Sequence, residues 1–242
     1  MIKRIGFACK FMHDDQTIKK KLLEEITILV SSLTNKYSNQ DSETRYVSVE
    51  KKFKKWSLVN EFKSKVLKYL AVYSYIKIPN DNYQNIHTLD LVNDFLPIDN
   101  NSIDLVITSP PYANTMDYYL YHKQRMNILD FDFKKVQKAE IGSRHEYSSK
   151  KENKEKWYKD FQITLSKISE KVKNKGEMIF VIGDSQIAGE LIDASEMVRV
   201  SAKNLNLSFE VLESYPMAGK SRYFNKAFQA KNKHEHILKL IK

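Results

Sequence analysis

Residues 103–112 read Ile-Asp-Leu-Val-Ile-Thr-Ser-Pro-Pro-Tyr, a short apolar run that ends at two adjacent prolines. A nearly continuous apolar run of this length is typical of a parallel strand that is buried on both faces. We therefore expect a central parallel strand over residues 103–108. Because ligands of open α/β sheets bind beyond the carboxyl ends of such strands, residues 109–112 lie where a site is expected.

Strand-like and helical patterns alternate after this run. We expect helices at about 156–172 and 187–205 and strands at about 178–182, 207–214 and 235–241. The triplet Asn174-Lys175-Gly176 is typical of a glycine cap at the end of the first helix. Alternating strands and helices predict an α/β fold with a mostly parallel, Rossmann-like sheet, and a closing antiparallel pair at its end.

The chain before residue 80 shows helical periodicity. Residues 2–9 fit a short strand, 17–33 a helix, and the polar stretch 34–44 an exposed loop. Residues 47–75 fit an amphipathic helix whose many lysines either form a solvated face or lie along phosphates. We place a boundary in the polar stretch, with an N-terminal segment of strand and helix over 1–45 and a catalytic region over 46–242.

The composition favours a globular protein that binds a polyanion. The chain has 242 residues, 42% of them hydrophobic, and a formal net charge of +10. Positive charge favours phosphate-bearing partners through counterion release. The alternative is that the net charge reflects only a lysine-rich composition, without such a partner. The single cysteine, Cys9, excludes an internal disulfide and a multi-cysteine zinc site. With no apolar stretch of signal or membrane-spanning length, we expect a soluble cytoplasmic protein without membrane contact.

The strand followed by Ser109, Pro110, Pro111 and Tyr112 resembles the catalytic motif of S-adenosylmethionine-dependent DNA amino-methyltransferases, which alkylate cytosine N4 or adenine N6. The resemblance extends over about residues 80–242. It takes in residues 96–104 before the motif, and 113–119, 140–144, 183–185 and 234–238 after it. The alternative is a Pro-Pro turn that ends a strand beside a half-buried tyrosine.

The resemblance implies a chemistry that this motif can perform. An exocyclic amine is a weak nucleophile, so the site must accept its protons and hold it in line with the methyl donor. In the family, the Ser109 hydroxyl oxygen and the Pro110 backbone carbonyl are the two acceptors. Pro111 stiffens the loop, and Tyr112 stacks on a base that has left the duplex.

The resemblance also assigns residues that bind the cofactor and DNA. Asp90 and Thr108 lie where the family contacts S-adenosylmethionine, although Asp90 can equally be an ordinary capping carboxylate. The expected contacts with phosphates or base edges come from Lys123, Arg125, Arg144, Lys220 and Arg222. The alternative for Lys123, Arg125 and Arg144 is a set of ion pairs with Glu140, Glu146 or Asp130.

A glycine-rich segment is missing from the pattern. Members of the family carry a Phe-x-Gly-x-Gly segment whose glycines let the backbone approach the cofactor, and no such segment occurs in this sequence. Residues 1–26 resemble instead the opening strand and helix of UV-damage endonuclease-like barrels. We therefore expect an incomplete methyltransferase sheet, whose partner would be a second polypeptide that carries the glycine-rich segment.

Histidines and a basic loop near the C-terminus have weaker functional interpretations. His234 and His236 alternate on the last strand and so share a face, but two histidines make a weak metal site, and we expect no metal. Residues 219–222 lack the spacing of a Walker A sequence and fit a basic loop near DNA better.

The sequence therefore predicts a DNA methyltransferase of a restriction–modification system. Cytosine N4 is the preferred target because a serine precedes the two prolines. Adenine N6, an RNA base, and a non-catalytic DNA-binding subunit or remnant of a split methyltransferase remain alternatives.

Overall fold

The computed structural model describes residues 29, 33, 36–37, 40–42, 45–75, 87–123, 126, 131–217 and 232–242. The chain divides into two compact units, one made of residues 1–86 and 119–138 and the other of residues 87–118 and 139–242. The sequence-based boundary near residue 45 stays a prediction.

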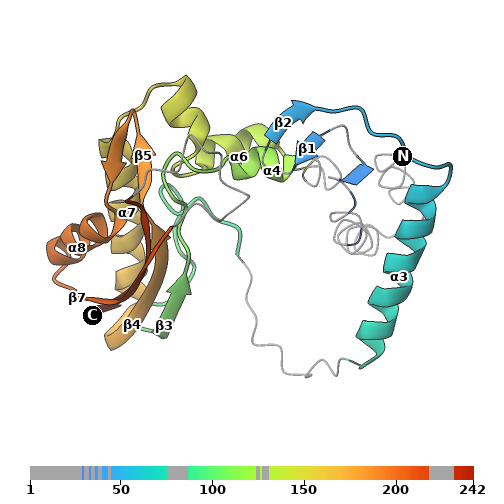
Figure 1. The fold of residues 1–242 in the computed structure, drawn as a ribbon. Helices are drawn as coiled ribbons and strands as arrows, with labels where there is room; N and C mark the ends of the chain where they lie inside the picture. Colours follow the sequence, from blue (N-terminus) through green and yellow to red (C-terminus); the bar gives the residue numbers. More distant parts are fainter. Residues whose placement is uncertain are drawn as a thin grey trace. The chain divides into compact units, whose positions relative to one another are not determined.

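A four-stranded mixed sheet lies at the centre of the second unit (Figure 1). Its strands are β3 (Ile103–Thr108), β4 (Val172–Gly183), β7 (Ser208–Pro216) and β8 (His234–Ile241), in the spatial order β3-β4-β8-β7. β3 is parallel to β4, whereas β8 is antiparallel to both β4 and β7. The α/β class and the closing antiparallel pair are confirmed. The expectation of a mostly parallel sheet is wrong for the described strands, since only one of their three pairings is parallel.

β3 is an edge strand of this sheet, not a central one. Among the described strands it pairs with β4 alone, which places it at the border. Val106 and Thr108 are half-buried, while Leu105 is 50% and Ile107 71% exposed. The prediction of burial on both faces is therefore wrong here. An apolar run shows that both faces suit burial, but it does not show which neighbours cover them.

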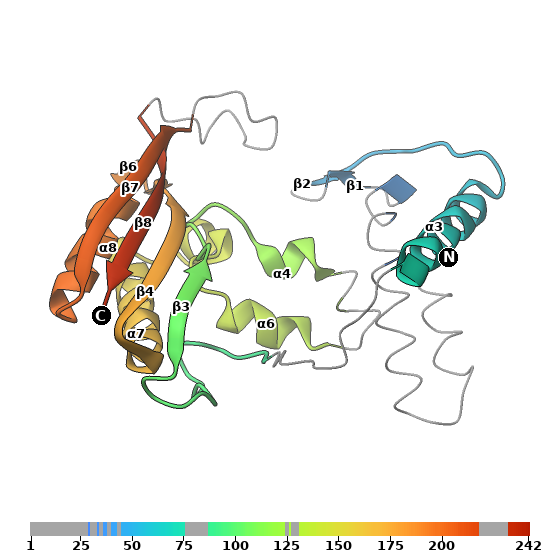
Figure 2. The same cartoon turned by 90° about the horizontal axis from the view of Figure 1, so that it is seen from below.

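Two helices, α7 (Lys154–Lys171) and α8 (Ala194–Asn204), pack on one face of the sheet (Figure 2). α7 begins at the cap residue Asn153, whose side chain accepts the Lys156 backbone N–H, and it presents an apolar face spaced by three and four residues. The core comprises Trp157, Phe161 and Leu165 of α7, Val198 and Ala202 of α8, and Met178, Phe180, Ile182, Leu238 and Leu240 of the strands.

The end of α7 differs from its prediction. The helix stops at Lys171, and Val172 already has extended backbone angles, so Asn174-Lys175-Gly176 lies inside β4 and caps nothing. A Cβ at Gly176 would lie 2.6 Å from Val172 Cγ1 and 2.9 Å from the Lys173 carbonyl oxygen. A glycine is therefore needed here because Val172 and Lys173 lie too close for a larger residue. The sequence alone does not distinguish this reason from a helix cap.

The first turns of the helix expected over 187–205 are also different. A small hairpin of β5 (Ser185–Ile187) and β6 (Glu190–Ile192) takes their place. Gly189 in its turn has a φ of +88°, a conformation that favours glycine. α8 begins only at Ala194, because the Asp193 side chain accepts the Glu196 backbone N–H and caps it there.

The first unit contains a short antiparallel pair and a long helix. β1 (Gln40–Ser42) pairs with β2 (Arg45–Ser48), so part of the stretch predicted to be a loop is a strand. α3 (Ser57–Tyr75) forms the C-terminal part of the helix predicted over 47–75. The strand predicted over 2–9, and most of the helix predicted over 17–33, lie outside the described residues.

Three short helices complete the described elements: α4 (Tyr118–Tyr121), α6 (Phe133–Ala139) and a π-helix, η1 (His145–Ser149). None of the helices described is both long enough and apolar enough to cross a bilayer.

Candidate functional site

The Ser-Pro-Pro-Tyr motif lies at the edge of the sheet where two parallel strands end. β3 ends at Thr108, which pairs with Phe180 three residues before the end of β4 at Gly183. β8 begins at the same edge, because its antiparallel register pairs Gly183 with Glu235. Residues far apart in the sequence therefore meet beyond the carboxyl ends of β3 and β4, where α/β sheets bind ligands.

Tyr112 is the best-defined side chain at this edge. Its hydroxyl donates a hydrogen bond of 2.6 Å to Oε1 of Glu235, 123 residues away. Its ring lies directly against Gly183, where a Cβ would be 2.7 Å from Cε2 of the ring. Glycine is therefore the residue that leaves room for the ring at the end of β4.

The electrostatics of Tyr112 keep its hydroxyl protonated. Burial raises its pKa well above the ordinary range, and the hydrogen bond and negative charge of Glu235 raise it further. Hydrogen bonding by the Ser109 side chain acts on the pKa of Tyr112 in the opposite direction and lowers it. Ser109 is exposed, whereas Pro110 and Pro111 are half-buried. The motif thus presents an accessible hydroxyl beside a fixed aromatic ring.

The loop after Tyr112 is joined to residues 140–145, two segments that carry the family resemblance. The Asn114 backbone N–H donates to the Gly142 carbonyl at 2.8 Å, and the Tyr118 N–H donates to a Glu140 carboxylate oxygen at 2.6 Å. The Asn114 side chain also donates to the Gln186 carbonyl at 2.7 Å. The motif therefore continues into a segment that is held from two sides.

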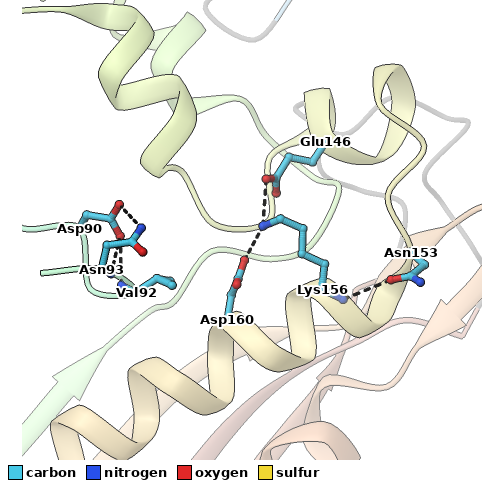
Figure 3. Close-up of polar contacts among 7 residues, drawn as sticks. All are labelled: Asp90, Val92, Asn93, Glu146, Asn153, Lys156 and Asp160. Atoms are coloured by element: carbon cyan, nitrogen blue, oxygen red, sulfur yellow. Dashed lines mark hydrogen bonds and ion pairs between the residues drawn. The ribbon is translucent and has the colours of Figure 1, made fainter.

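A partly buried ion cluster supports the same region (Figure 3). Lys156 on α7 contacts the Glu146 carboxylate at 3.0 Å and the Asp160 carboxylate at 2.5 Å. Burial acts to lower the pKa of Lys156, but the hydrogen bonds to Asp160 and Glu146 together raise it. Glu146 belongs to η1 and is buried, so Lys156 ties the π-helix to α7.

The carboxylates of Glu140 and Glu146, the alternative ion-pair partners of Arg144, also make other contacts. The Glu146 carboxylate pairs with Lys156, and the Glu140 carboxylate accepts the Tyr118 backbone N–H. Arg144 itself is half-buried, and its backbone N–H donates to the Met116 carbonyl at 3.4 Å.

Both predicted cofactor contacts lie among the described residues. Asp90 lies in a turn, where Oδ1 accepts the Val92 and Asn93 backbone N–H groups and Oδ2 accepts the Asn93 side-chain amide (Figure 3). Both carboxylate oxygens are used locally, which is the geometry of a capping carboxylate. Thr108 is half-buried at the end of β3. Asp90 and Thr108 therefore do not by themselves form a fitted site for S-adenosylmethionine.

The predicted DNA contacts are only partly described. The Lys123 ammonium lies 4.8 Å from the centre of the Phe133 ring, in the first unit. Arg125, Lys220 and Arg222 lie outside the described residues.

Asp184 organises the other side of the same sheet edge. Its carboxylate accepts the backbone N–H groups of Ala194 and His234, at 2.9 and 2.8 Å, and contacts His236 Nε2 at 3.2 Å. His236 Nδ1 lies 2.8 Å from the Ser214 hydroxyl. Potential ligand atoms of Asp184, Asp193 and His236 lie within 4.8 Å of one another. The hydrogen bonds of Asp184 tie the end of β4 to α8 and β8.

Two residues of the site were not identified from the sequence. Glu235 was noted only as part of the resembling segment 234–238 on the last strand, and its contact with Tyr112 was not predicted. Gly183 was noted as part of the resemblance, but its contact with Tyr112 was not predicted. A glycine at the end of a buried strand is a usable sign of a close approach by another residue.

Comparisons with known proteins give little further identification. No protein-family model matches the chain, and no curated protein matches it. A solved structure from Thermus thermophilus, described provisionally as a DNA modification methylase, is similar over 64% of this chain with 16% identity and a TM-score of 0.37. The match spans 52% of that protein, about half of its length.

Proposed function

We propose that this chain contains the base-binding part of a DNA amino-methyltransferase that uses S-adenosylmethionine as methyl donor. The observation that carries the proposal is the position of Ser109 beside Tyr112 beyond the carboxyl end of β3, with Tyr112 held by Gly183 and Glu235. An exposed hydroxyl next to a fixed aromatic ring suits a flat base that bears an amine.

The chemistry assigned to this chain's residues is acceptance of hydrogen bonds. The Ser109 hydroxyl oxygen and the Pro110 backbone carbonyl accept hydrogen bonds from the two N–H groups of the amine, which draws nitrogen electron density away from the ring and toward its lone pair. The adjacent prolines restrict the backbone and keep the two acceptors in place. S-adenosylmethionine, when bound, would supply the methyl group, with its sulfonium becoming a neutral thioether and one amine proton passing to solvent.

Cytosine N4 is the proposed target, within a restriction–modification system. The serine before the two prolines is the basis for choosing cytosine, and adenine N6 or an RNA base is the alternative. Identification of the methylated nucleoside separates these targets.

The cofactor-binding half is proposed to come from elsewhere, such as a second polypeptide with the glycine-rich segment. The exposed outer residues of β3, Leu105 and Ile107, favour this arrangement, because a parallel strand rarely leaves a face open to water. In a doubly wound sheet the cofactor-binding strand is a neighbour of such a strand at the switch point. In this arrangement, the second polypeptide binds most of the cofactor, and Asp90 and Thr108 are proposed to add contacts from this chain.

A non-catalytic DNA-binding subunit is the second candidate. The missing glycine-rich segment and the local use of both Asp90 oxygens favour it. It predicts DNA binding that weakens steeply with salt, without measurable affinity for S-adenosylmethionine. In this case Lys123, Arg125, Arg144, Lys220 and Arg222 remain the proposed DNA contacts.

The test is transfer of labelled methyl from S-adenosylmethionine to mixed-sequence DNA, followed by digestion and identification of the nucleosides. Ser109→Ala and Tyr112→Ala are expected to abolish the label, while Ser208→Ala, an exposed serine on β7, retains it. Label in N4-methylcytosine supports the enzyme. Absence of label from the chain alone, together with salt-sensitive DNA binding, fits both a split enzyme and the non-catalytic subunit; label that appears only when the polypeptide with the glycine-rich segment is added supports the split enzyme.

A further inference from the structure

Glu235 accepts a short hydrogen bond from the hydroxyl of Tyr112 at the edge of the sheet. The bond is 2.6 Å long and joins the loop after β3 to the second residue of β8. The register places Glu235 opposite Gly183, against which the Tyr112 ring lies. The ring is therefore held at its hydroxyl by Glu235 and along one edge by the end of β4.

Stacking on a base does not need the hydroxyl of a tyrosine. A phenylalanine ring offers the same π-face, so the presence of the hydroxyl calls for another reason. The Glu235 carboxylate supplies one, because a hydrogen bond to an ionised acceptor is short, directional and stronger than a neutral one. The hydroxyl remains a donor because burial and Glu235 raise the pKa of Tyr112.

We propose that Glu235 is a positioning residue of the base site, whose carboxylate fixes the Tyr112 ring in the orientation that stacks on the base. The inference rests on the proposed function, since it assigns a role within the same site. A ring that is already oriented loses less conformational freedom when the base arrives, so a larger share of the stacking energy appears as affinity.

A purely structural role for the bond is the alternative to be excluded. The bond could serve only to join the loop to β8, in which case its loss would weaken folding without changing how the folded protein binds a base. The test therefore needs a signal from the Tyr112 ring itself and a measurement of affinity on folded protein.

The experiment uses the full chain labelled with ¹³C at the tyrosine rings, with the Tyr112 signal assigned by its loss in Tyr112→Phe. The signal is followed during titration with a mixed-sequence single-stranded oligonucleotide, and the affinity is measured on the same samples. Glu235→Ala removes the acceptor, and Glu235→Gln keeps an oxygen that can accept. Glu177→Ala is the matched control, because Glu177 is a carboxylate on the neighbouring strand that pairs with Lys239.

In wild type, Glu235→Gln and Glu177→Ala, we expect the oligonucleotide to shift the Tyr112 signal through stacking. In Glu235→Ala we expect the free-protein signal to move, the shift on binding to shrink, and the affinity to fall about fivefold to tenfold. An unchanged affinity in folded Glu235→Ala overturns the inference, even if its thermal stability is lower. A Tyr112 signal that does not respond to the oligonucleotide in wild type also overturns it.

Methyl transfer is measured separately on the same variants. If wild type transfers no methyl group even with the cofactor-binding polypeptide present, but its Tyr112 signal responds to DNA in a way that depends on Glu235, the catalytic proposal fails and the positioning role stands. If wild type transfers methyl groups and Glu235→Ala does so with unchanged kcat and KM, the positioning role fails and the catalytic proposal stands.

Discussion

Gly183 lies so close to Tyr112 that a Cβ at this glycine would be 2.7 Å from Cε2 and 3.0 Å from Cδ2 of the ring. The two residues lie at and beyond the ends of adjacent parallel strands and are far apart in the chain. Replacement of Gly183 by alanine must therefore displace the ring. We expect Gly183→Ala to lower the free energy of unfolding by about 1–3 kcal/mol, the usual cost of overpacking, and to lower methyl transfer. Denaturant unfolding measures the first effect.

The contact itself is tested by combining two substitutions. In the Tyr112→Ala background the ring is gone, so Gly183→Ala should cost much less stability than it does in wild type. The remaining near neighbour, Met217 Sδ at 3.2 Å, belongs to a flexible side chain that can move. Equal costs in the two backgrounds would contradict the assignment of strain to the ring.

Asp184 is expected to be a stability residue. Its carboxylate accepts the Ala194 and His234 backbone N–H groups and contacts His236. Asp184→Ala leaves these donors without their acceptor, so the free energy of unfolding should fall by about 2–4 kcal/mol. Asp193→Ala, which removes only the cap of α8, should cost about 1 kcal/mol. Similar losses in the two variants, measured by urea unfolding, would argue against a central role for Asp184.

Lys156 is expected to stabilise the protein in a pH-dependent way. Its pKa in the folded protein is raised above the ordinary 10.5, with burial opposing and Asp160 and Glu146 favouring the charged form. The stabilisation is therefore fully present below the pKa of the unfolded chain and is lost as the pH rises through the folded pKa. Lys156→Met should lower the free energy of unfolding by about 1–2 kcal/mol at neutral pH, since the lysine is partly exposed.

The difference between Lys156→Met and wild type should shrink as the pH rises through the folded pKa of Lys156, which lies above 10.5, because both proteins then lack the ammonium charge. Unfolding curves at neutral pH and at several alkaline values measure it. Lys154→Met, which breaks the more exposed pair with Glu190, should leave stability unchanged at every pH. A constant deficit of Lys156→Met across the range would show that packing rather than charge is lost.

A substitution on the exposed face of β3 is expected to affect function without affecting stability. Ile107 is 71% exposed, so Ile107→Lys should change the free energy of unfolding by less than about 0.5 kcal/mol. If a cofactor-binding half joins β3 there, the same substitution should abolish methyl transfer in the complete system. Val106→Lys, on the face turned toward the core, should instead destabilise the fold by roughly 2 kcal/mol or more. Full methyl transfer by Ile107→Lys would contradict a partner at this face.

Local patterns predicted those elements whose signal is contained in a few adjacent residues. The spacing of Trp157, Phe161 and Leu165 predicted α7, and the run at 178–182 predicted the buried part of β4. The first part of the helix predicted over 187–205 failed. A two-stranded turn around Gly189 and the cap at Asp193 replaced it, and these local hydrogen bonds outweighed the helical periodicity.

By itself the sequence determined that a Ser-Pro-Pro-Tyr loop follows a strand in an α/β chain, because both strand pattern and proline geometry are local properties. The tertiary structure decided that β3 is at the border of the described sheet, that Gly183 makes room for Tyr112, and that Glu235 accepts its hydroxyl. These relationships depend on the register of strands distant in the chain, and register is set by the packing of the whole sheet.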